Sequence, residues 1–231
     1  MLFPALVNLG LEKLLCRLSK HNSLNITYHG VVKKDSRYFS PRHITEEQFE
    51  KHLQYYRKNF NIIPLKKIFD KDYPREKEQK TISITFDDGY LNNLETALPL
   101  LKKYNISATF FISGICTQPM EIRALWPDII ACLAYFYKNE LIEINGKVYK
   151  NLYCEESGTW LPDIIKLLPP DQHDSMIDEI IDKFQIGKLL QKIPNEIWQQ
   201  MNRDEIVAIS KSPVADIGSH GYAHYNLGNI D

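Results

Sequence analysis

Apolar and polar residues alternate along the first sixty-five positions in blocks that predict strands and a helix. Leu24–Val32 and Asn61–Leu65 are short apolar runs typical of strands. Between them, Thr45–Asn59 has the spacing of a helix, capped by Thr45 and with Gln48 in the first turn. The segment 71–80 is densely charged, which predicts a solvated loop.

The next forty residues predict two strands joined by a helix. Thr81–Phe86 places its apolar residues on one face and its hydroxyl residues on the other, as a strand does. Leucines then recur at helical spacing from Leu91 to Leu101, with Pro99 expected to kink or restart the helix, and Ala108–Ser113 forms the next strand. A strand, a helix and a strand in so short a span predict parallel pairing with a right-handed crossover, and therefore an α/β sheet or barrel.

Residues 115–201 interrupt this order and are expected to form an insertion within one domain that spans residues 1–231. The pattern predicts a hairpin turning at Asn145 and Gly146, and three helices, two inside the insertion and one just beyond it, over Ile129–Lys138, Asp171–Phe184 and Arg203–Ser210. Regular order returns with a strand at Val214–Gly218.

Composition narrows the classes of protein and partner. A chain of 231 residues with a net charge of -1 offers no basic field for nucleic acid or for an anionic membrane. Its four cysteines lack metal-like spacing and are expected to be reduced and mostly buried. The first 23 residues predict a packing helix, with no signal peptide or transmembrane segment, so we expect a cytoplasmic protein.

Ionisable side chains gather where two predicted strands end. Asp87 and Asp88 follow one strand, and His220 and His224 follow another. The carboxyl ends of parallel strands face one crevice, so these residues can meet in space. Two imidazoles and one carboxylate can bind a metal with positions left open, while the other carboxylate accepts a proton from a water that the metal acidifies.

Each half of this site also has a simpler explanation. Asp-Asp-Gly is a common turn composition, and two histidines four residues apart can arise by chance. Tyr222 and Tyr225 flank the histidines and could stack on a sugar, although packing is the better explanation for them. The remaining histidines of the chain, in contexts that look polar, are assigned no function: His21, His43, His52 and His173.

At these residues the chain resembles the polysaccharide deacetylase family, the nodulation-protein-B homology domain that is also carbohydrate esterase family 4. TFDDGY at Thr85–Tyr90 matches the first motif, and ATFFISG resembles the family's next strand. His220 and His224 match the second motif in spacing, with Gly221 in place of the usual hydroxyl residue. ITYHGV at Ile26–Val31 resembles the subgroup that begins with a Tyr-His strand.

The resemblance implies a role for each matched residue. Asp87 would be the general base, and a divalent metal would be bound by Asp88, His220 and His224. Zinc is the expected metal, although cobalt, nickel or iron also suits nitrogen and oxygen ligands. In the Tyr-His subgroup an N-terminal histidine, here His29, supplies the acid. Tyr90 and Tyr222 are the candidate contacts to the substrate.

The implied fold is a distorted (β/α) barrel with fewer than eight strands, and the implied substrates are N-acetylated sugars, polysaccharides or lipid-linked saccharides. The chain stops at Asp231, whereas the family continues through further motifs. This favours a fragment of a longer protein or a covering partner chain, a second copy included. Two other functions stay open: an inactive module that binds metal and carbohydrate, and a non-haem iron oxygenase, whose metal ligands are also two histidines and a carboxylate.

Overall fold

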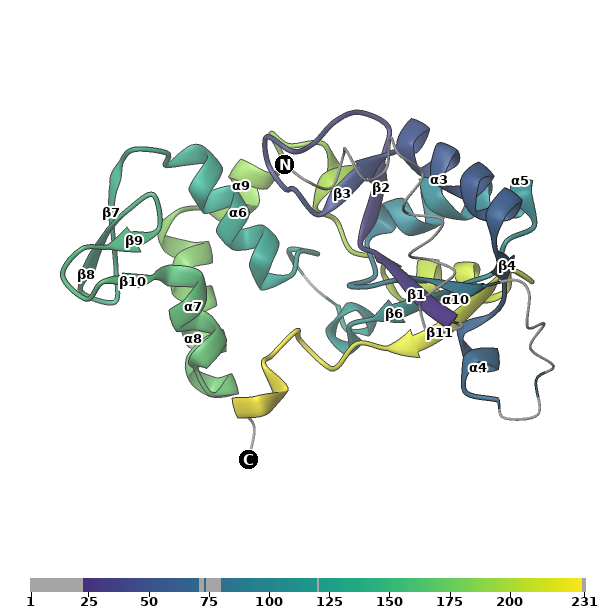
Figure 1. Ribbon diagram of the computed structural model, residues 1–231. Coiled ribbons are helices and arrows are strands. Elements are labelled where there is room, and N and C mark those ends of the chain that lie inside the picture. Colours follow the sequence, from purple (N-terminus) through teal and green to yellow (C-terminus); the bar gives the residue numbers. More distant parts are fainter. Residues whose placement is uncertain (1–22, 71–72, 74–79, 120, 230–231) are drawn as a thin grey trace, which may run out of the picture.

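The structure is a computed structural model that describes residues 23–70, 73, 80–119 and 121–229. A parallel β-sheet lies in the half of the molecule that is on the right in Figure 1. Its strands run in the order β1, β5, β6, β11, and β4 pairs with β5 beside that path. All of these pairs are parallel, which confirms the α/β class. The path is open at β1 and β11 among the described strands, so closure into a barrel is not confirmed. The bounds are β1 Ser23–Tyr28, β4 Asn61–Ile62, β5 Thr81–Phe86, β6 Ala108–Ile112 and β11 Ala215–Ser219.

Strand β5 is buried along its whole length, and its two faces differ as its sequence predicts. The isoleucines Ile82 and Ile84 pack in the core at 1% and 0% exposure. On the other face, the Ser83 hydroxyl donates to the Asn25 side chain at 2.7 Å, and the Thr85 hydroxyl donates to Thr27 at 3.1 Å. This polar ladder joins β5 to β1 and satisfies hydroxyl groups that burial would otherwise leave unpaired.

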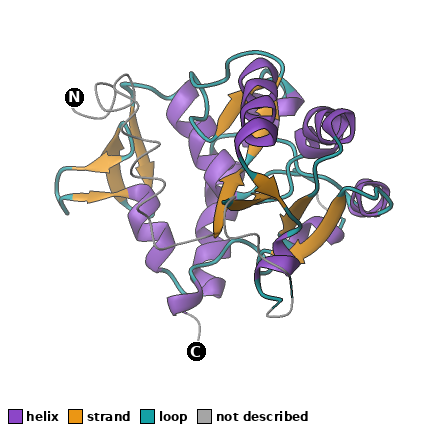
Figure 2. Cartoon of the chain, turned by 45° about the vertical axis from the view of Figure 1, so that its right-hand side comes forward, coloured by secondary structure: helices purple, strands orange, loops and turns teal. Residues whose placement is uncertain are grey.

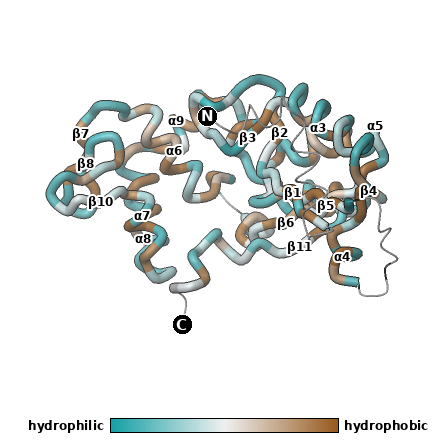
Figure 3. Tube along the Cα trace, viewed as in Figure 1, coloured by the Kyte–Doolittle hydropathy of each residue, from teal (hydrophilic) through white to brown (hydrophobic). Residues whose placement is uncertain are grey.

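Helices α3 (Glu46–Asn59) and α5 (Leu98–Tyr104) pack against each other beside the sheet (Figure 1). Thr45 and Gln48 form the predicted capping box, and polar and apolar residues alternate along α3 as expected for a helix with one buried face (Figure 3). Ahead of α5 the chain makes a π-helix at Asn93–Ala97, so the restart predicted near Pro99 is confirmed. Helix α4 (Leu65–Ile68) replaces the end of the strand predicted over Asn61–Leu65, and α10 spans Arg203–Ser210 as predicted.

The strand predicted over Leu24–Val32 is broken at His29. After β1 the chain continues as β2 (Gly30–Val32), which pairs with β3 (His43–Thr45) instead of with β5. Two asparagine side chains stabilise the backbone at this interruption. Asn92 accepts a hydrogen bond from Val31 N at 3.1 Å, and Asn93 donates one to His29 O at 2.8 Å. The sequence gives no sign of the break, because the groups that satisfy the backbone come from a distant helix.

Residues 115–201 build a second hydrophobic cluster around helix α6 (Trp126–Phe136). A small antiparallel sheet lies at its far end, with helices between it and the central strands (Figure 2). Asn145 and Gly146 both have positive φ, at 51° and 72°, as the predicted tight turn requires. The other elements of this part are β7 Leu141–Ile144, β8 Lys147–Lys150, β9 Tyr153–Cys154, β10 Thr159–Trp160, α7 Leu161–Leu167, α8 Pro170–Lys183 and α9 Ile186–Leu190.

Three predictions concern residues that are wholly or mostly outside the described part. They are the helix over residues 1–23, the thiol Cys16 and most of the loop 71–80. The other three cysteines, Cys116, Cys132 and Cys154, are free and buried, as expected. Within the described residues, no helix combines the length and the apolar character needed to cross a membrane.

Candidate metal centre

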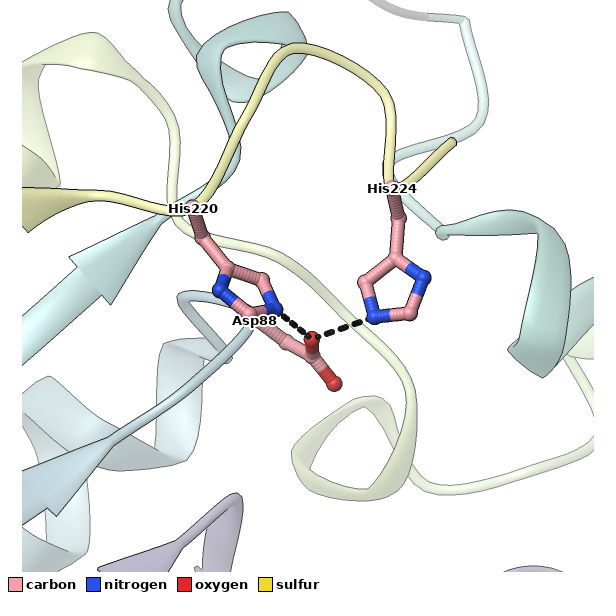
Figure 4. Close-up of side chains that lie close together, drawn as sticks. All are labelled: Asp88, His220 and His224. Atoms are coloured by element: carbon pink, nitrogen blue, oxygen red, sulfur yellow. Dashed lines mark ion pairs between the residues drawn. The ribbon is translucent and has the colours of Figure 1, made fainter. Parts of the chain in front are cut away.

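Asp88 and the two motif histidines converge beyond the carboxyl ends of β5 and β11 (Figure 4). The Asp88 Oδ1 atom lies 3.4 Å from His220 Nε2 and 3.2 Å from His224 Nε2. Asp88 is 1% exposed and each histidine 31% exposed, so the cluster is buried on its carboxylate side and open on its imidazole side. The sheet therefore brings together residues that are more than 130 positions apart in the sequence.

The backbone around these ligands adopts conformations that favour the observed convergence. Asp88 and His224 have φ of 75° and 61°, a left-handed region that few non-glycine residues adopt. The turn after β5 is tied down by residues 199–201, since Leu91 N donates to Gln199 O at 2.8 Å and Met201 N donates to Gly89 O at 2.9 Å. The histidine loop is tied to the end of β6 by His220 N, which donates to Ile112 O at 2.9 Å.

The three side chains fit a divalent metal. One ligand atom from each lies within 4.8 Å of the others, and both carboxylate oxygens of Asp88 are buried without a hydrogen-bond partner among the described residues. Metal–ligand bonds of about 2.0–2.1 Å at tetrahedral angles separate two ligand atoms by about 3.3 Å. The observed separations of 3.4 and 3.2 Å match that value.

The pKa values of the two adjacent aspartates, Asp87 and Asp88, are shifted in opposite directions. Burial alone would raise the pKa of Asp88, but the close approach of the His220 and His224 imidazoles to its Oδ1 atom outweighs burial and holds that pKa well below its usual range. In turn, Asp88 raises the pKa of His220. Burial raises the pKa of Asp87, against the opposing effect of His220, which makes Asp87 the better proton acceptor of the two aspartates.

A cavity of about 540 Å³ opens beside the cluster. Asp88, His224 and His29 all line it, so His29 faces the crevice that the metal ligands border. Its remaining wall is largely apolar and comes from the loop before β3, from helices α6 and α7, and from the turn between β8 and β9: Phe39, Pro41, Trp126, Pro127, Ile130, Ala131, Ala134, Leu152 and Pro162.

The two tyrosines expected to contact a substrate lie in different environments. Tyr222 is 55% exposed and stays a candidate contact. Tyr90 is completely buried, and its hydroxyl donates to Asp128 at 3.0 and 3.1 Å. The prediction that Tyr90 contacts the substrate is therefore wrong for this structure: burial removes its ring from the crevice, and its hydroxyl is used inside the protein.

The sequence did not single out Arg42 and Asp128, which border the metal ligands. Arg42 Nη2 donates to Asp128 Oδ1 at 2.5 Å, and Arg42 Nη1 lies 3.9 Å from Asp88 Oδ2. Asp128 is 0% exposed, and burial raises its pKa to about 7 although Arg42 acts in the opposite direction. The one signal in the sequence was an aspartate within the apolar helical stretch Trp126–Phe136, because a carboxylate is rarely buried without a partner.

Two of the histidines that were expected in polar surroundings are in fact buried. His43 and His173 are each 4% exposed. His43 Nε2 is bonded to Ile197 O at 2.6 Å, and its ring packs edge-on against Tyr90. Tertiary packing buried them, and nothing in the neighbouring sequence indicates that contact.

Comparison with known proteins finds the family that the two sequence motifs resemble. Residues 74–131 match the model of the polysaccharide deacetylase family, a span that holds β5, the two aspartates and β6. YxkH of Bacillus subtilis, named for this family, is 30% identical over 91 residues, which cover 38% of this chain and 31% of YxkH. The peptidoglycan-N-acetylmuramic acid deacetylase PdaA of the same organism is 32% identical over 98 residues, 36% of this chain and 37% of PdaA. The chain thus spans about a third of the length of these relatives.

Among solved structures, the de-N-acetylase of Aggregatibacter actinomycetemcomitans aligns with 90% of this chain and 97% of its own, at 15% identity and a TM-score of 0.40. The Streptococcus pyogenes deacetylase PplD, solved with acetate, aligns with 40% of this chain and 43% of its own, at 21% identity and a TM-score of 0.35. Over residues 74–131, the span that the family model matches, the chain is therefore similar to the polysaccharide deacetylase family.

Proposed function

We propose that the protein hydrolyses the N-acetyl group of a sugar, with a divalent metal held by Asp88, His220 and His224. The observation that carries this proposal is the convergence of those three side chains beside a cavity that His29 also lines. Two imidazole nitrogens and one carboxylate oxygen leave coordination positions open, as catalytic rather than structural sites do.

The bound metal would acidify a water molecule and polarise the acyl carbonyl group. Zinc fits the ligand set best, and cobalt, nickel and iron also suit it. Asp88 would hold the metal because its carboxylate points at both histidines, whereas Asp87 follows the same strand with its pKa raised by burial.

Proton transfer would be divided between Asp87 and His29. Asp87 accepts a proton from the water as its oxygen forms a bond to the acyl carbon. His29 donates a proton to the sugar nitrogen as the carbon–nitrogen bond breaks, because an amide anion is too basic to leave. The products are acetate and the free amino sugar.

The wider predictions fit this activity and are kept as part of the proposal. They are one catalytic domain with residues 115–201 as an insertion, closure of the sheet into a distorted barrel, a position in the cytoplasm and a soluble or lipid-linked saccharide as substrate. The apolar wall of the cavity suits the methyl group and the ring faces of an N-acetylated sugar.

An assay of acetate release tests the proposal. The purified chain, loaded with zinc or cobalt, would be given N-acetylglucosamine, its oligomers, nucleotide-linked and lipid-linked forms, and peptidoglycan fragments. We expect release from at least one substrate, and a loss of about a hundredfold or more when His220 and His224 are both replaced by alanine. The control variant is His52→Ala, since His52 lies on α3 outside the cavity lining.

Tight metal binding without release from any substrate would favour the inactive carbohydrate-binding module instead. The oxygenase alternative has less support, because the ligands stand at the ends of parallel strands and the relatives carry deacetylase names.

A further inference from the structure

We propose that Arg42 is a positioning residue that orients the Asp88 carboxylate for metal binding, and that Asp128 and Tyr90 hold Arg42 in place. This inference rests on the proposed function only in taking Asp88 as a metal ligand.

The two oxygens of Asp88 face different partners. Oδ1 lies 3.4 and 3.2 Å from the imidazole nitrogens of His220 and His224, and Oδ2 faces Arg42 Nη1 at 3.9 Å. At that distance Arg42 and Asp88 form an ion pair and not a direct hydrogen bond. The cation therefore attracts one oxygen by charge while the other stays directed at the histidines. This division favours a carboxylate that binds through one oxygen.

Arg42 itself is fixed by several contacts. Its Nη2 atom donates to Asp128, which is 0% exposed, and its Nε atom donates to Ser40 Oγ at 3.2 Å. The guanidinium carbon lies 5.8 Å from the centre of the Tyr90 ring. The Tyr90 hydroxyl in turn donates to both oxygens of Asp128. A side chain held in this way keeps its charge at one point relative to Asp88.

Arg42 also balances the charge of two buried carboxylates, which is a second reason for its position. Asp88 and Asp128 are both buried, at 1% and 0% exposure, and Arg42 is the cation that the structure places between them. Without Arg42 each of the two buried carboxylates would lose the counter-charge that they share. A metal-ligating carboxylate whose supporting partner is removed commonly loses affinity for the metal.

The test is a zinc titration of the metal-free protein against a competing chromophoric chelator. We expect Arg42→Gln to weaken zinc binding by about 10- to 100-fold, which is the usual effect of removing a partner of a metal ligand. Arg42→Lys should restore part of the loss, because it returns the charge without the planar fork. Arg37→Gln is the matched control, since Arg37 is exposed, pairs with exposed Asp35 and is not part of the cavity lining, so its loss should leave zinc binding unchanged.

The double variant Arg42→Gln with Asp128→Asn separates positioning from support of the fold. It leaves no unpaired buried charge at this pair, so its melting temperature should recover relative to Arg42→Gln alone while zinc binding stays weak. If Arg42→Gln does not fold, Tyr90→Phe loosens the same network with little change in volume, and a several-fold loss of zinc affinity is expected.

Unchanged zinc affinity in Arg42→Gln, or in Tyr90→Phe, would overturn the proposal. So would full recovery of zinc binding in the double variant, since the effect of Arg42 would then be one of stability alone. A rise in KM with unchanged zinc affinity would also overturn it, and would make Arg42 a substrate contact. Zinc affinity is measured without substrate, so an inactive protein that binds zinc would contradict the proposed function and leave this inference standing.

Discussion

The indole N–H of Trp126 donates a hydrogen bond of 3.1 Å to the backbone carbonyl oxygen of His224. The two rings also pack edge to face, with their centres 6.3 Å apart. Trp126 is the first residue of α6, so the segment 115–201 reaches the metal centre and supports one of its ligands. Because the φ of His224 is 61°, this loop has a backbone conformation that needs such support.

Replacing Trp126 with phenylalanine keeps an aromatic ring and removes the donor. We expect the free energy of unfolding to fall by at least about 1 kcal/mol, the usual net value of one hydrogen bond, with a further loss because the smaller ring fills less of the core. Urea unfolding measures this. Trp160→Phe is the control, because Trp160 is 50% exposed and should change stability little. Equal losses in the two variants would show that the bond to His224 contributes nothing.

The two adjacent aspartates should respond differently to the same substitution. Asp87→Asn removes the proposed base, so turnover should fall by about a hundredfold or more while metal content stays the same. Asp88→Asn removes the carboxylate that faces both histidines and should lower metal affinity. Elemental analysis beside the acetate assay distinguishes them. Loss of metal in Asp87→Asn with retention in Asp88→Asn would mean that the two roles are reversed.

His29→Ala should lower acetate release by about a hundredfold or more without changing metal content. The expectation follows from the position of His29 in the wall of the cavity that Asp88 and His224 also line. A substrate with a good leaving group should lose less, because its nitrogen needs less help from an acid. Normal turnover of an N-acetyl sugar by His29→Ala would place the acid elsewhere.

His43 should make the fold sensitive to mild acid. Burial lowers its pKa from 6.5 to about 4, and while Nε2 bonds to Ile197 O, the buried Nδ1 atom has no partner for a second proton among the described residues. The folded state therefore binds fewer protons than the unfolded chain, and the stability that this group contributes is complete above its unfolded pKa and is lost as pH falls toward 4.

Between pH 7 and pH 5 the loss from His43 should be about 2 kcal/mol. Denaturant unfolding of the protein and of His43→Gln at both pH values measures it. The variant starts less stable, and it should lose about that much less between the two conditions. Parallel pH dependence in the two proteins would contradict the assignment to His43.

The sequence correctly predicted those elements whose apolar pattern and capping residues lie within the element itself. Helix α10 has the predicted bounds of Arg203–Ser210, and α3 has the capping box predicted from Thr45 and Gln48. The meeting of Asp88 with the two histidines could also be predicted, because the carboxyl ends of parallel strands share one edge.

Features that depend on distant partners could not be predicted in this way. The pair Arg42 and Asp128 joins residues 86 positions apart, and no periodicity marks either one. Tyr90 is buried and donates to the same Asp128, a partner that the sequence does not indicate, so its burial could not be predicted. The strand break at His29 has the same origin, since Asn92 and Asn93 supply the bonds that hold it.

Removal and return of the metal is the most direct test of metal-dependent deacetylation. Acetate release from the best N-acetylated substrate would be measured before chelation, after the metal has been removed and verified by elemental analysis, and during titration with zinc. Activity should disappear with the metal and return in full at about one zinc ion per chain. A metal-free chain that releases acetate at the original rate would contradict this expectation.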